Sequence, residues 1–173
     1  MVQLNHYQTL EKMKNISLSS EIILFLCGIS SENLGLILRS ADIFGVKKVV
    51  YFGNELENKQ KIKKLSRNST VDLEFTDDKN FLHILKEDGY LLVALEITDS
   101  AEPISQMKLN KKTCLIVGNE QHGIPQEMLD ACEKSYYIEM ASKNISSLNV
   151  AIATSIALNK YLEINQNLTS QGV

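Results

Sequence analysis

The sequence predicts an α/β domain with a mostly parallel β-sheet flanked by helices, and two observations lead to this prediction. Apolar segments alternate along the chain with segments of helical periodicity, which is the order expected of a parallel sheet with crossover helices. Most of the apolar segments are continuous, as expected for strands that are covered on both faces. The chain has 173 residues, of which 44% are hydrophobic and 23% are charged, and this suits one globular domain.

Six apolar segments are predicted to form the strands. In chain order they are Ile22–Cys27, Lys48–Gly53, Val71–Phe75, Tyr90–Leu95, Thr113–Val117 and Tyr136–Met140. Four other segments are predicted to be helices, namely Asn33–Phe44, Asn80–Asp88, Pro125–Ala131 and Ser147–Leu162. The last helix is apolar nearly all round in its middle, so we expect neighbours to bury it on more than one side.

The predicted domain spans residues 21–163, with residues 1–20 as an N-terminal extension and residues 164–173 as a C-terminal tail. No apolar run approaches the roughly 18 residues that cross a bilayer, and the first residues lack the apolar stretch of a secretory signal. Cys27, Cys114 and Cys132 are widely spaced and form no C-x-x-C pair, which argues against disulfides and a structural zinc site. We therefore expect a cytoplasmic protein without a membrane partner.

The motifs that the sequence lacks exclude several classes of enzyme. None of its eight glycines forms G-x-G, so the dinucleotide fingerprint is missing. Gly118 and Gly123 have the spacing of a phosphate-binding P-loop, but Ile124 and Pro125 follow where Lys and Ser or Thr are required. The chain has no H-E-x-x-H or G-x-S-x-G motif, and its three histidines are scattered. The sequence therefore does not support a hydrolase, a nucleoside triphosphatase or a metalloenzyme, and we expect no bound metal.

The helix predicted from Asn33 has an unusual face. Its apolar residues recur at helical spacing and define the core side, which leaves Gly35, Arg39 and Asp42 on the opposite side. A glycine inside a helix costs about 1 kcal/mol relative to alanine, and the close approach of another backbone or of a ligand would explain its presence. Arg39 would then project from a contacted face. An ordinary amphipathic helix with a surface arginine is the alternative.

The segment from Leu115 to Pro125 leads from a buried strand into a polar loop bracketed by glycines. Glycine permits positive φ angles and close backbone approach. In open α/β sheets, ligands bind at the carboxyl ends of the strands. The N–H and C=O groups of this loop are therefore candidates to bind the edge of an adenine or a ribose, and a plain turn from strand to helix is the alternative.

A third segment runs from Ile138 to Ala153 and leads from a strand into the last helix. Ser147 or Asn149 is predicted to cap this helix, since both residue types favour that position. The amide of Asn149 stands among apolar neighbours, so we expect it to be buried and to have hydrogen-bond partners. A capping role alone is the alternative.

Together and in this order, the three segments resemble the SpoU/TrmH family of RNA ribose 2′-O-methyltransferases, within the SPOUT superfamily. The first segment matches the pattern N-x-G-x-x-x-R-x-A at Asn33, Gly35, Arg39 and Ala41. The second matches (L/I)-V-G-x-E-x-x-G at Val117, Gly118, Glu120 and Gly123. The third matches S-L-N-V at Ser147, Leu148, Asn149 and Val150. The resemblance covers roughly residues 20–162. The chain departs from the family at Glu139 and Ser142, where proline and glycine are usual, and its loop before Ser147 looks one residue longer.

The resemblance implies that the α/β fold ends in a C-terminal trefoil knot. It also implies a cofactor, S-adenosylmethionine, which is bent inside the knot and held largely by the backbone of three loops. Carried over to this sequence, the cofactor-binding residues are Leu95, Gly118, Ile138, Met140 and Leu148. Members of the family are homodimers with the site near the interface, and such an interface would explain the apolar last helix.

The implied reaction is methylation of a ribose 2′-hydroxyl in structured RNA, with tRNA favoured over rRNA as the target. The resemblance assigns the activating role to Arg39. Because a guanidinium is a very poor base, we interpret this role as electrostatic. Asn33 would position the ribose, and Glu120 would fix Arg39 or the loop through a charge-assisted hydrogen bond. Ser147 and Asn149 would order the knot and the target nucleotide.

A formal net charge of −3 excludes a strongly basic protein that coats nucleic acid, so RNA binding requires a local source of positive charge. The segment from Asn58 to Arg67 supplies one. Its five basic residues are Lys59, Lys61, Lys63, Lys64 and Arg67. We expect this stripe to contact phosphates and to make RNA binding sensitive to salt, and a solvated lysine-rich helix is the alternative.

Two other functions stay open on the sequence alone. One is a catalytically inactive relative that binds RNA as an assembly factor. The altered segment from Ile138 to Ser142 favours it, whereas the retained motif residues argue against it. The other is a doubly wound nucleotide-binding or regulatory domain, which lacks the phosphate-binding motifs that it would need.

Overall fold

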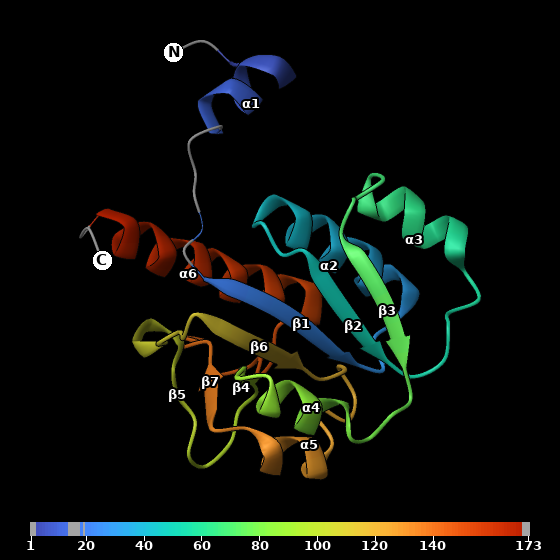
Figure 1. Cartoon of the computed structure of the whole chain (residues 1–173), viewed down its shortest axis with the longest axis vertical. Helices are drawn as coiled ribbons and strands as arrows, with labels where there is room; N and C mark the ends of the chain where they lie inside the picture. Colours follow the sequence, from blue (N-terminus) through green and yellow to red (C-terminus); the bar gives the residue numbers. More distant parts are fainter. Residues whose placement is uncertain (1–2, 14–17, 19, 171–173) are drawn as a thin grey trace.

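Seven parallel strands form one sheet in the computed structural model, which describes residues 3–13, 18 and 20–170 (Figure 1). The strands are β1 (Glu21–Cys27), β2 (Lys48–Phe52), β3 (Asp72–Thr76), β4 (Leu91–Leu95), β5 (Glu102–Pro103), β6 (Lys112–Val117) and β7 (Lys134–Tyr137). Their order across the sheet is β3-β2-β1-β6-β4-β7-β5, and each pair of neighbours is parallel. The predicted α/β fold with a mostly parallel sheet is therefore confirmed.

Helices cover both faces of this sheet. The helices in the described ranges are α1 (His6–Met13), α2 (Ser31–Ile43), α3 (Lys59–Ser66), α4 (Phe81–Glu87), α5 (Gln126–Ala131) and α6 (Val150–Ser170), with a short 3-10 helix η1 (Ile104–Gln106). α2 and α6 pack on one face and α3 lies against α2, whereas α4 and α5 pack on the other face (Figure 1). Within the described ranges, no helix has both the length and the apolar character needed to span a bilayer.

Alternate side chains of the central strands divide the interior into two cores. On β1, Ile22, Leu24 and Leu26 belong to the core under α2 and α6. Ile23 and Phe25 belong to the core under α4 and α5. All five side chains are buried, because successive residues of a strand point to opposite faces and both faces are covered. This burial explains the continuous apolar runs of the sequence.

α2 is held at both ends in a way that fixes where Asn33 lies. The side chain of Ser30 caps the helix by accepting a hydrogen bond from the Asn33 backbone N–H at 3.3 Å. After the helix, Gly45 adopts a φ of +77°, which lets the chain turn back toward β2. Asn33 therefore lies in the first turn of α2, just after the carboxyl end of β1.

Several elements differ from the sequence prediction, which did not include α1 and α3 among its helices. β7 spans Lys134–Tyr137 rather than Tyr136–Met140, because the chain leaves the sheet after Tyr137 and its next residues line a pocket instead. β5 has only two residues, too few to leave a periodic pattern in the sequence. α6 continues to Ser170, beyond the predicted end of the last helix at Leu162.

The cysteines are free thiols packed in or near the core under α4 and α5. Burial, with a smaller contribution from Cys132, raises the pKa of Cys27 to about 12. Burial likewise raises the pKa of Cys132 to about 12 and that of Cys114 well above its usual value. Since the reactive form of cysteine is the thiolate, these three thiols act as core side chains at neutral pH.

Candidate active site

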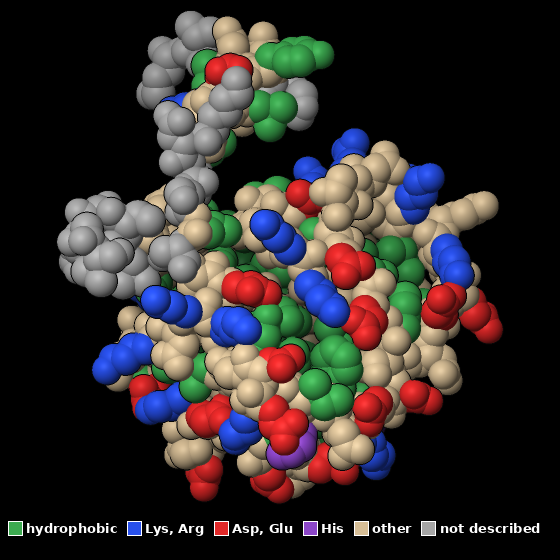
Figure 2. Space-filling model, viewed as in Figure 1, with side chains coloured by type: hydrophobic (Ala, Val, Ile, Leu, Met, Phe, Trp, Pro, Cys, Tyr) green, Lys and Arg blue, Asp and Glu red, His purple; other side chains and the backbone are tan. Residues whose placement is uncertain are grey.

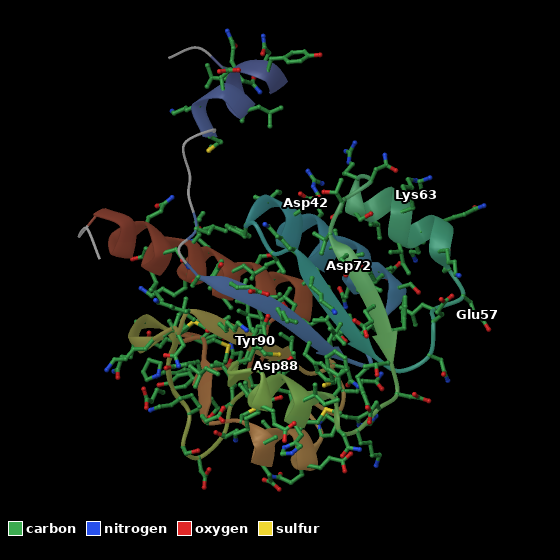
Figure 3. The ribbon with its side chains drawn as sticks, viewed as in Figure 1. Asp42, Glu57, Lys63, Asp72, Asp88 and Tyr90 are labelled. Carbon is green, nitrogen blue, oxygen red and sulfur yellow. The ribbon has the colours of Figure 1, made fainter. Side chains whose placement is uncertain are left out.

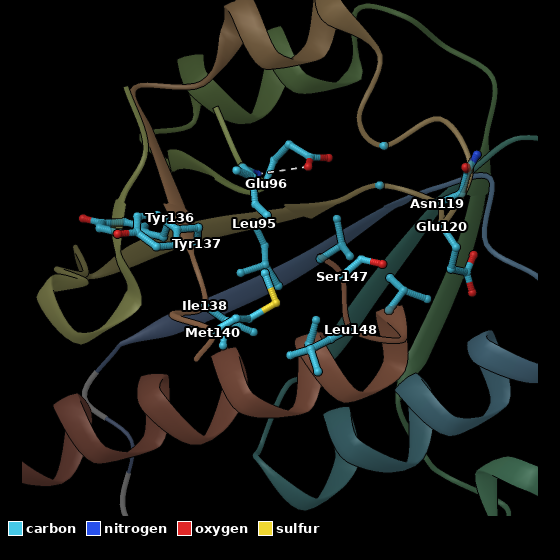
Figure 4. A pocket seen from close by; sticks show the side chains of 16 residues that line it. Leu95, Glu96, Asn119, Glu120, Tyr136, Tyr137, Ile138, Met140, Ser147 and Leu148 are labelled. Atoms are coloured by element: carbon cyan, nitrogen blue, oxygen red, sulfur yellow. Dashed lines mark hydrogen bonds between the residues drawn. The ribbon is translucent and has the colours of Figure 1, made fainter. Parts of the chain in front are cut away.

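A pocket of about 230 Å³ lies at the carboxyl ends of β4, β6 and β7 (Figure 4). These three strands are neighbours in the sheet and run parallel, so the loops that follow them meet at one edge. The loop after β4, the loop between β6 and α5, and the loop between β7 and α6 supply most of its walls, and the first turn of α6 completes them.

The structure brings most of the predicted catalytic and cofactor-binding residues to this pocket. Its lining includes the five residues proposed to bind the cofactor, which are Leu95, Gly118, Ile138, Met140 and Leu148. Two of the residues proposed for catalysis, Glu120 and Ser147, also line it. The apolar side chains offer a wall on which a flat heterocycle can lie, as is usual for small-molecule pockets.

Gly118 and Gly123 form the neck of a tight loop at one side of the pocket. The Asn119 N–H donates to the Gly123 carbonyl at 3.2 Å, and the Gly123 N–H donates to the Asn119 carbonyl at 3.0 Å. A Cβ on Gly118 would lie 2.1 Å from the Gly123 carbonyl carbon, which leaves no room for a side chain. Gly123 has a φ of +65°, a conformation that glycine adopts without strain. The geometry of this loop therefore explains why both positions are occupied by glycine.

Asn33, Glu120 and Asn149, one from each sequence motif, form a chain of hydrogen bonds beside the pocket. The Asn33 side-chain amide donates to Glu120 Oε1. Asn33 Oδ1 in turn accepts a hydrogen bond from Asn149 Nδ2 at 3.1 Å. Asn149 Oδ1 caps α6 by accepting from the backbone N–H groups of Ala151 at 2.9 Å and Ile152 at 3.3 Å. These contacts tie the start of α2, the loop after β6 and the start of α6 together.

The structure corrects one expectation about this network and narrows another. Asn149 is exposed rather than buried, because it caps α6 at the point where the surface loop enters the helix. Ser147, the other candidate cap, lines the pocket instead. Of the two roles expected for Glu120, its hydrogen bond from Asn33 fits the one of holding the loop, whereas Arg39 of the same chain lines the groove between α2 and α6 instead.

Gly35, Arg39 and Asp42, which were predicted to share one face of the helix, each have different neighbours in the structure. Gly35 is buried under α3, where a Cβ would lie 3.0 Å from the Ile62 carbonyl oxygen. The close approach of another backbone therefore explains this glycine. Asp42 accepts a hydrogen bond from the Thr70 N–H at 2.8 Å. Arg39 is exposed and lies outside the pocket of its own chain.

Arg39 lines a groove of about 690 Å³ between α2 and α6. Four apolar side chains on this surface are exposed, namely Leu36 at 40%, Ile43 at 68%, Ile152 at 54% and Ile156 at 38%. Arg39 forms no hydrogen bond or ion pair with any residue that the structure describes. The last helix packs against the core under the sheet, against α2 and against η1, but its face at this groove stays open within one chain.

Several residues line the pocket without having been predicted as site residues from the sequence, among them Glu96, Asn119, Tyr136 and Tyr137. Glu96 Oε1 accepts a hydrogen bond from the Ile97 N–H at 3.0 Å, and Oε2 accepts one from the Ile124 N–H at 3.2 Å. Its side chain therefore ties the loop after β4 to the loop after β6. No sequence motif marks this residue. Its position directly after the buried strand β4 is the one signal that points to it.

The departures from the family pattern lie at the outer side of the loop between β7 and α6. Glu139 Oε2 accepts a hydrogen bond from the Ser105 hydroxyl of η1 at 3.1 Å. Ser142 Oγ accepts hydrogen bonds from the backbone N–H groups of Asn144 and Ile145 at 3.2 and 3.1 Å. Glu139 and Ser142 are exposed and do not line the pocket, so these departures leave its lining intact.

The five basic residues predicted to contact RNA lie on α3 and at its end. Two of them are paired, since Lys59 lies 2.5 Å from Glu55 and Lys61 contacts Glu32. Lys63, Lys64 and Arg67 are exposed, and no acidic residue in the described ranges pairs with them. Figure 2 shows Lys and Arg side chains over α3, and Figure 3 labels Lys63 there. The segment thus forms a helix, which was named from the sequence only as the alternative, and three of its cations have no acidic partner in the described ranges.

Comparison with known proteins places these features in a family. A family model described as the SpoU rRNA Methylase family matches residues 21–159. The tRNA (guanosine(18)-2′-O)-methyltransferase of Escherichia coli (strain K12) is 30% identical over 140 residues, which are 79% of this chain and 60% of that protein. The 23S rRNA (guanosine-2′-O-)-methyltransferase RlmB of Nitrosomonas europaea is 27% identical over 178 residues, which cover 100% of this chain and 68% of that protein.

Solved structures share the fold. The TrmH/SpoU tRNA modifying enzyme of A. aeolicus superposes with a TM-score of 0.79 at 24% identity, over 94% of this chain and 85% of that chain. The chain spans about three fifths of the length of the E. coli relative, at 60%. Since the family model matches most of the chain, including all three motifs and the pocket, the protein belongs to the SpoU rRNA methylase family.

Proposed function

We propose that the protein transfers a methyl group from S-adenosylmethionine to a ribose 2′-hydroxyl of structured RNA, with tRNA as the preferred target over rRNA. The observation that carries this proposal is the meeting of the three motifs at one pocket through the hydrogen bonds among Asn33, Glu120 and Asn149. Family membership and the names of the relatives support the reaction class.

The residues of the pocket suit the proposed cofactor. Leu95, Ile138 and Leu148 supply apolar surface for an adenine, and Gly118 lines the pocket without a side chain of its own. When bound, the cofactor supplies a methyl group on a sulfonium centre. We also propose that the chain after β7 is threaded as the trefoil knot of the SPOUT fold. In the strand order, β7 follows β4 on the side away from β6, and α6, which comes after β7 in the chain, packs against α2. This arrangement supports the proposed threading.

We propose that two copies of the chain form a homodimer through the groove between α2 and α6. An exposed apolar surface of this kind is typical of a protein–protein interface. Arg39 lies in the groove and outside its own pocket, so the dimer would bring Arg39 of the partner subunit to the pocket. There the guanidinium would bind the phosphate next to the target ribose and stabilise the negative charge that develops on the 2′ oxygen. Asn33, held by Glu120, would orient the ribose.

Replacing Ile152 with Glu is expected to weaken dimerisation about 100-fold, because a charge at a desolvated apolar interface costs about 2.7 kcal/mol or more. Sedimentation measurements on the full chain would follow the dimer, and methyl transfer should be lost together with it. Ile84→Glu is the matched control, since Ile84 is exposed to a similar degree, 47% against 54%, but lies on α4. A dimer that survives Ile152→Glu unchanged would contradict this interface.

Replacing Lys63, Lys64 and Arg67 with Gln is expected to reduce the salt dependence of RNA binding. Each lost phosphate contact lowers the slope of log K against log salt by about 0.7 to 0.9, so the slope should fall by about 2 to 3. The matched control replaces Lys79, Lys86 and Lys134, three lysines that pair with acids elsewhere on the molecule. Equal slopes for the two triple variants would show that α3 does not contact RNA.

Two measurements on the unmodified protein test the proposed function itself. Calorimetry with S-adenosylmethionine should detect binding, and tritiated methyl groups should be transferred to tRNA, at ribose positions that then resist alkaline hydrolysis. A parallel reaction with rRNA tests the stated preference. Binding of RNA with no transfer to either RNA would instead favour the inactive assembly factor.

A further inference from the structure

The pocket is lined by acidic groups without basic ones. Glu96 and Glu120 line it, and no Lys, Arg or His is among its lining residues, all of which the structure describes. The two carboxylates come from different loops, Glu96 from the loop after β4 and Glu120 from the loop after β6 (Figure 4). A ligand in this pocket therefore meets a negative potential from its own subunit.

Glu96 is fixed in position without being neutralised. Both of its oxygens accept hydrogen bonds from backbone N–H groups, from Ile97 at 3.0 Å and from Ile124 at 3.2 Å. No cationic side chain in the described ranges pairs with it. A carboxylate has about four acceptor sites, so each oxygen keeps capacity to interact with a ligand. Because Glu96 is partly buried, its charge is screened less than that of a surface carboxylate.

Glu120 differs from Glu96 in its surroundings. The Asn33 amide bonds to it, and this contact belongs to the network that joins the three motifs. Glu96 lies outside that network and its carboxylate stands against the backbone of Gly123, where a Cβ would come 2.6 Å from Glu96 Oε2. Of the two acids, Glu96 is thus the one whose carboxylate takes no part in the hydrogen bonds that join the three motifs.

We propose that Glu96 makes the pocket select the cationic methyl donor over its neutral by-product. This inference rests on the proposed function. S-adenosylmethionine carries a positively charged sulfonium, and loss of the methyl group leaves S-adenosylhomocysteine, whose thioether is neutral. The two molecules share the same adenosine and amino-acid groups, so a carboxylate in the pocket distinguishes them by charge. The preference would favour release of the by-product after each transfer.

Calorimetry on the full chain tests this selection with three ligands: S-adenosylmethionine, S-adenosylhomocysteine and sinefungin, in which an amine replaces the sulfonium. The unmodified protein is expected to bind both cationic ligands about tenfold more tightly than the neutral one, a modest gain for a carboxylate near a cation. Glu96→Gln should weaken the cationic ligands by about that factor and leave S-adenosylhomocysteine nearly unchanged. Glu57→Gln is the matched control, because Glu57 is an exposed acid remote from the pocket lining.

Two results would overturn the selection. The first is equal affinity of the unmodified protein for S-adenosylhomocysteine and S-adenosylmethionine. This result would overturn the selection even if the variant did not fold. Equal weakening of all three ligands by Glu96→Gln would show that Glu96 only holds the loops together. If none of the three ligands bound to the unmodified protein, the proposed function itself would fail, and this result is distinct from both of the others.

Discussion

Replacing Arg39 with Ala is expected to slow methyl transfer by about 10²- to 10³-fold, the usual effect of removing one group that stabilises charge in a transition state. Binding of S-adenosylmethionine should change little, because the proposed partner of the Arg39 guanidinium is the RNA phosphate beside the target ribose and not the cofactor. Single-turnover transfer of tritiated methyl groups and calorimetry measure the two effects separately. Arg39→Lys should recover only part of the rate, since an ammonium group lacks the planar fork that holds a phosphate.

The side of the dimer on which Arg39 acts can be determined by mixing two inactive variants. One subunit would carry Arg39→Ala with an intact pocket, and the other would keep Arg39 but carry a disrupted pocket. If Arg39 acts on the pocket of the partner, the mixed dimer contains one complete site and activity returns. Full activity of Arg39→Ala alone would remove the catalytic assignment, and a mixed dimer without activity would place the action of Arg39 within its own subunit.

Gly118→Ala is expected to abolish binding of S-adenosylmethionine and to lower the stability of the protein by about 1–3 kcal/mol, the usual cost of overpacking. The added Cβ would lie 2.1 Å from the carbonyl carbon of Gly123 and 2.4 Å from the nitrogen of Ile124. The loop after β6 would have to open, and the hydrogen bond from Ile124 to Glu96 would be lost. Calorimetry and thermal unfolding of the full chain measure both effects.

Gly89→Ala is the control for this substitution. Gly89 has a φ of +85° and no atom within 4 Å of an added Cβ, so alanine would strain the backbone there without touching a neighbour. A small loss of stability with unchanged ligand binding is expected. If Gly118→Ala bound S-adenosylmethionine like the unmodified protein, the tight neck between Gly118 and Gly123 would not be needed for the pocket.

The strands of the sheet were predictable because burial on both faces leaves continuous apolar runs, as on β1. The sixth predicted strand was displaced for a related reason. Ile138 and Met140 continue the apolar pattern after Tyr137, but they face the pocket rather than a neighbouring strand. Apolar character alone does not distinguish these two surroundings. β5, with two residues, offers no pattern at all.

Those residues of the candidate site that belong to a sequence motif were predictable. Residues whose role depends on which elements pack around them were not. Helical periodicity defined the core side of α2 correctly, but it could not tell that α3 covers Gly35 while the surface around Arg39 stays open. Asn149 stands among apolar residues in the sequence, yet its role as a helix cap keeps it at the surface. Glu96 belongs to no motif and gains its importance only because two loops meet at its carboxylate.

The order of the strands also determines how the chain can fold. β1 pairs with β2 close by in the sequence, but its other neighbour is β6, so that Ile22 lies opposite Thr113. Such long-range parallel pairing is slow to form, since the entropy of closing a long loop must be lost before any contact compensates it. On the ribosome, the unit from β1 to β3 can assemble early, while one edge of β1 stays open until β6 has been synthesised. During that interval, the nascent chain is at its most exposed to aggregation.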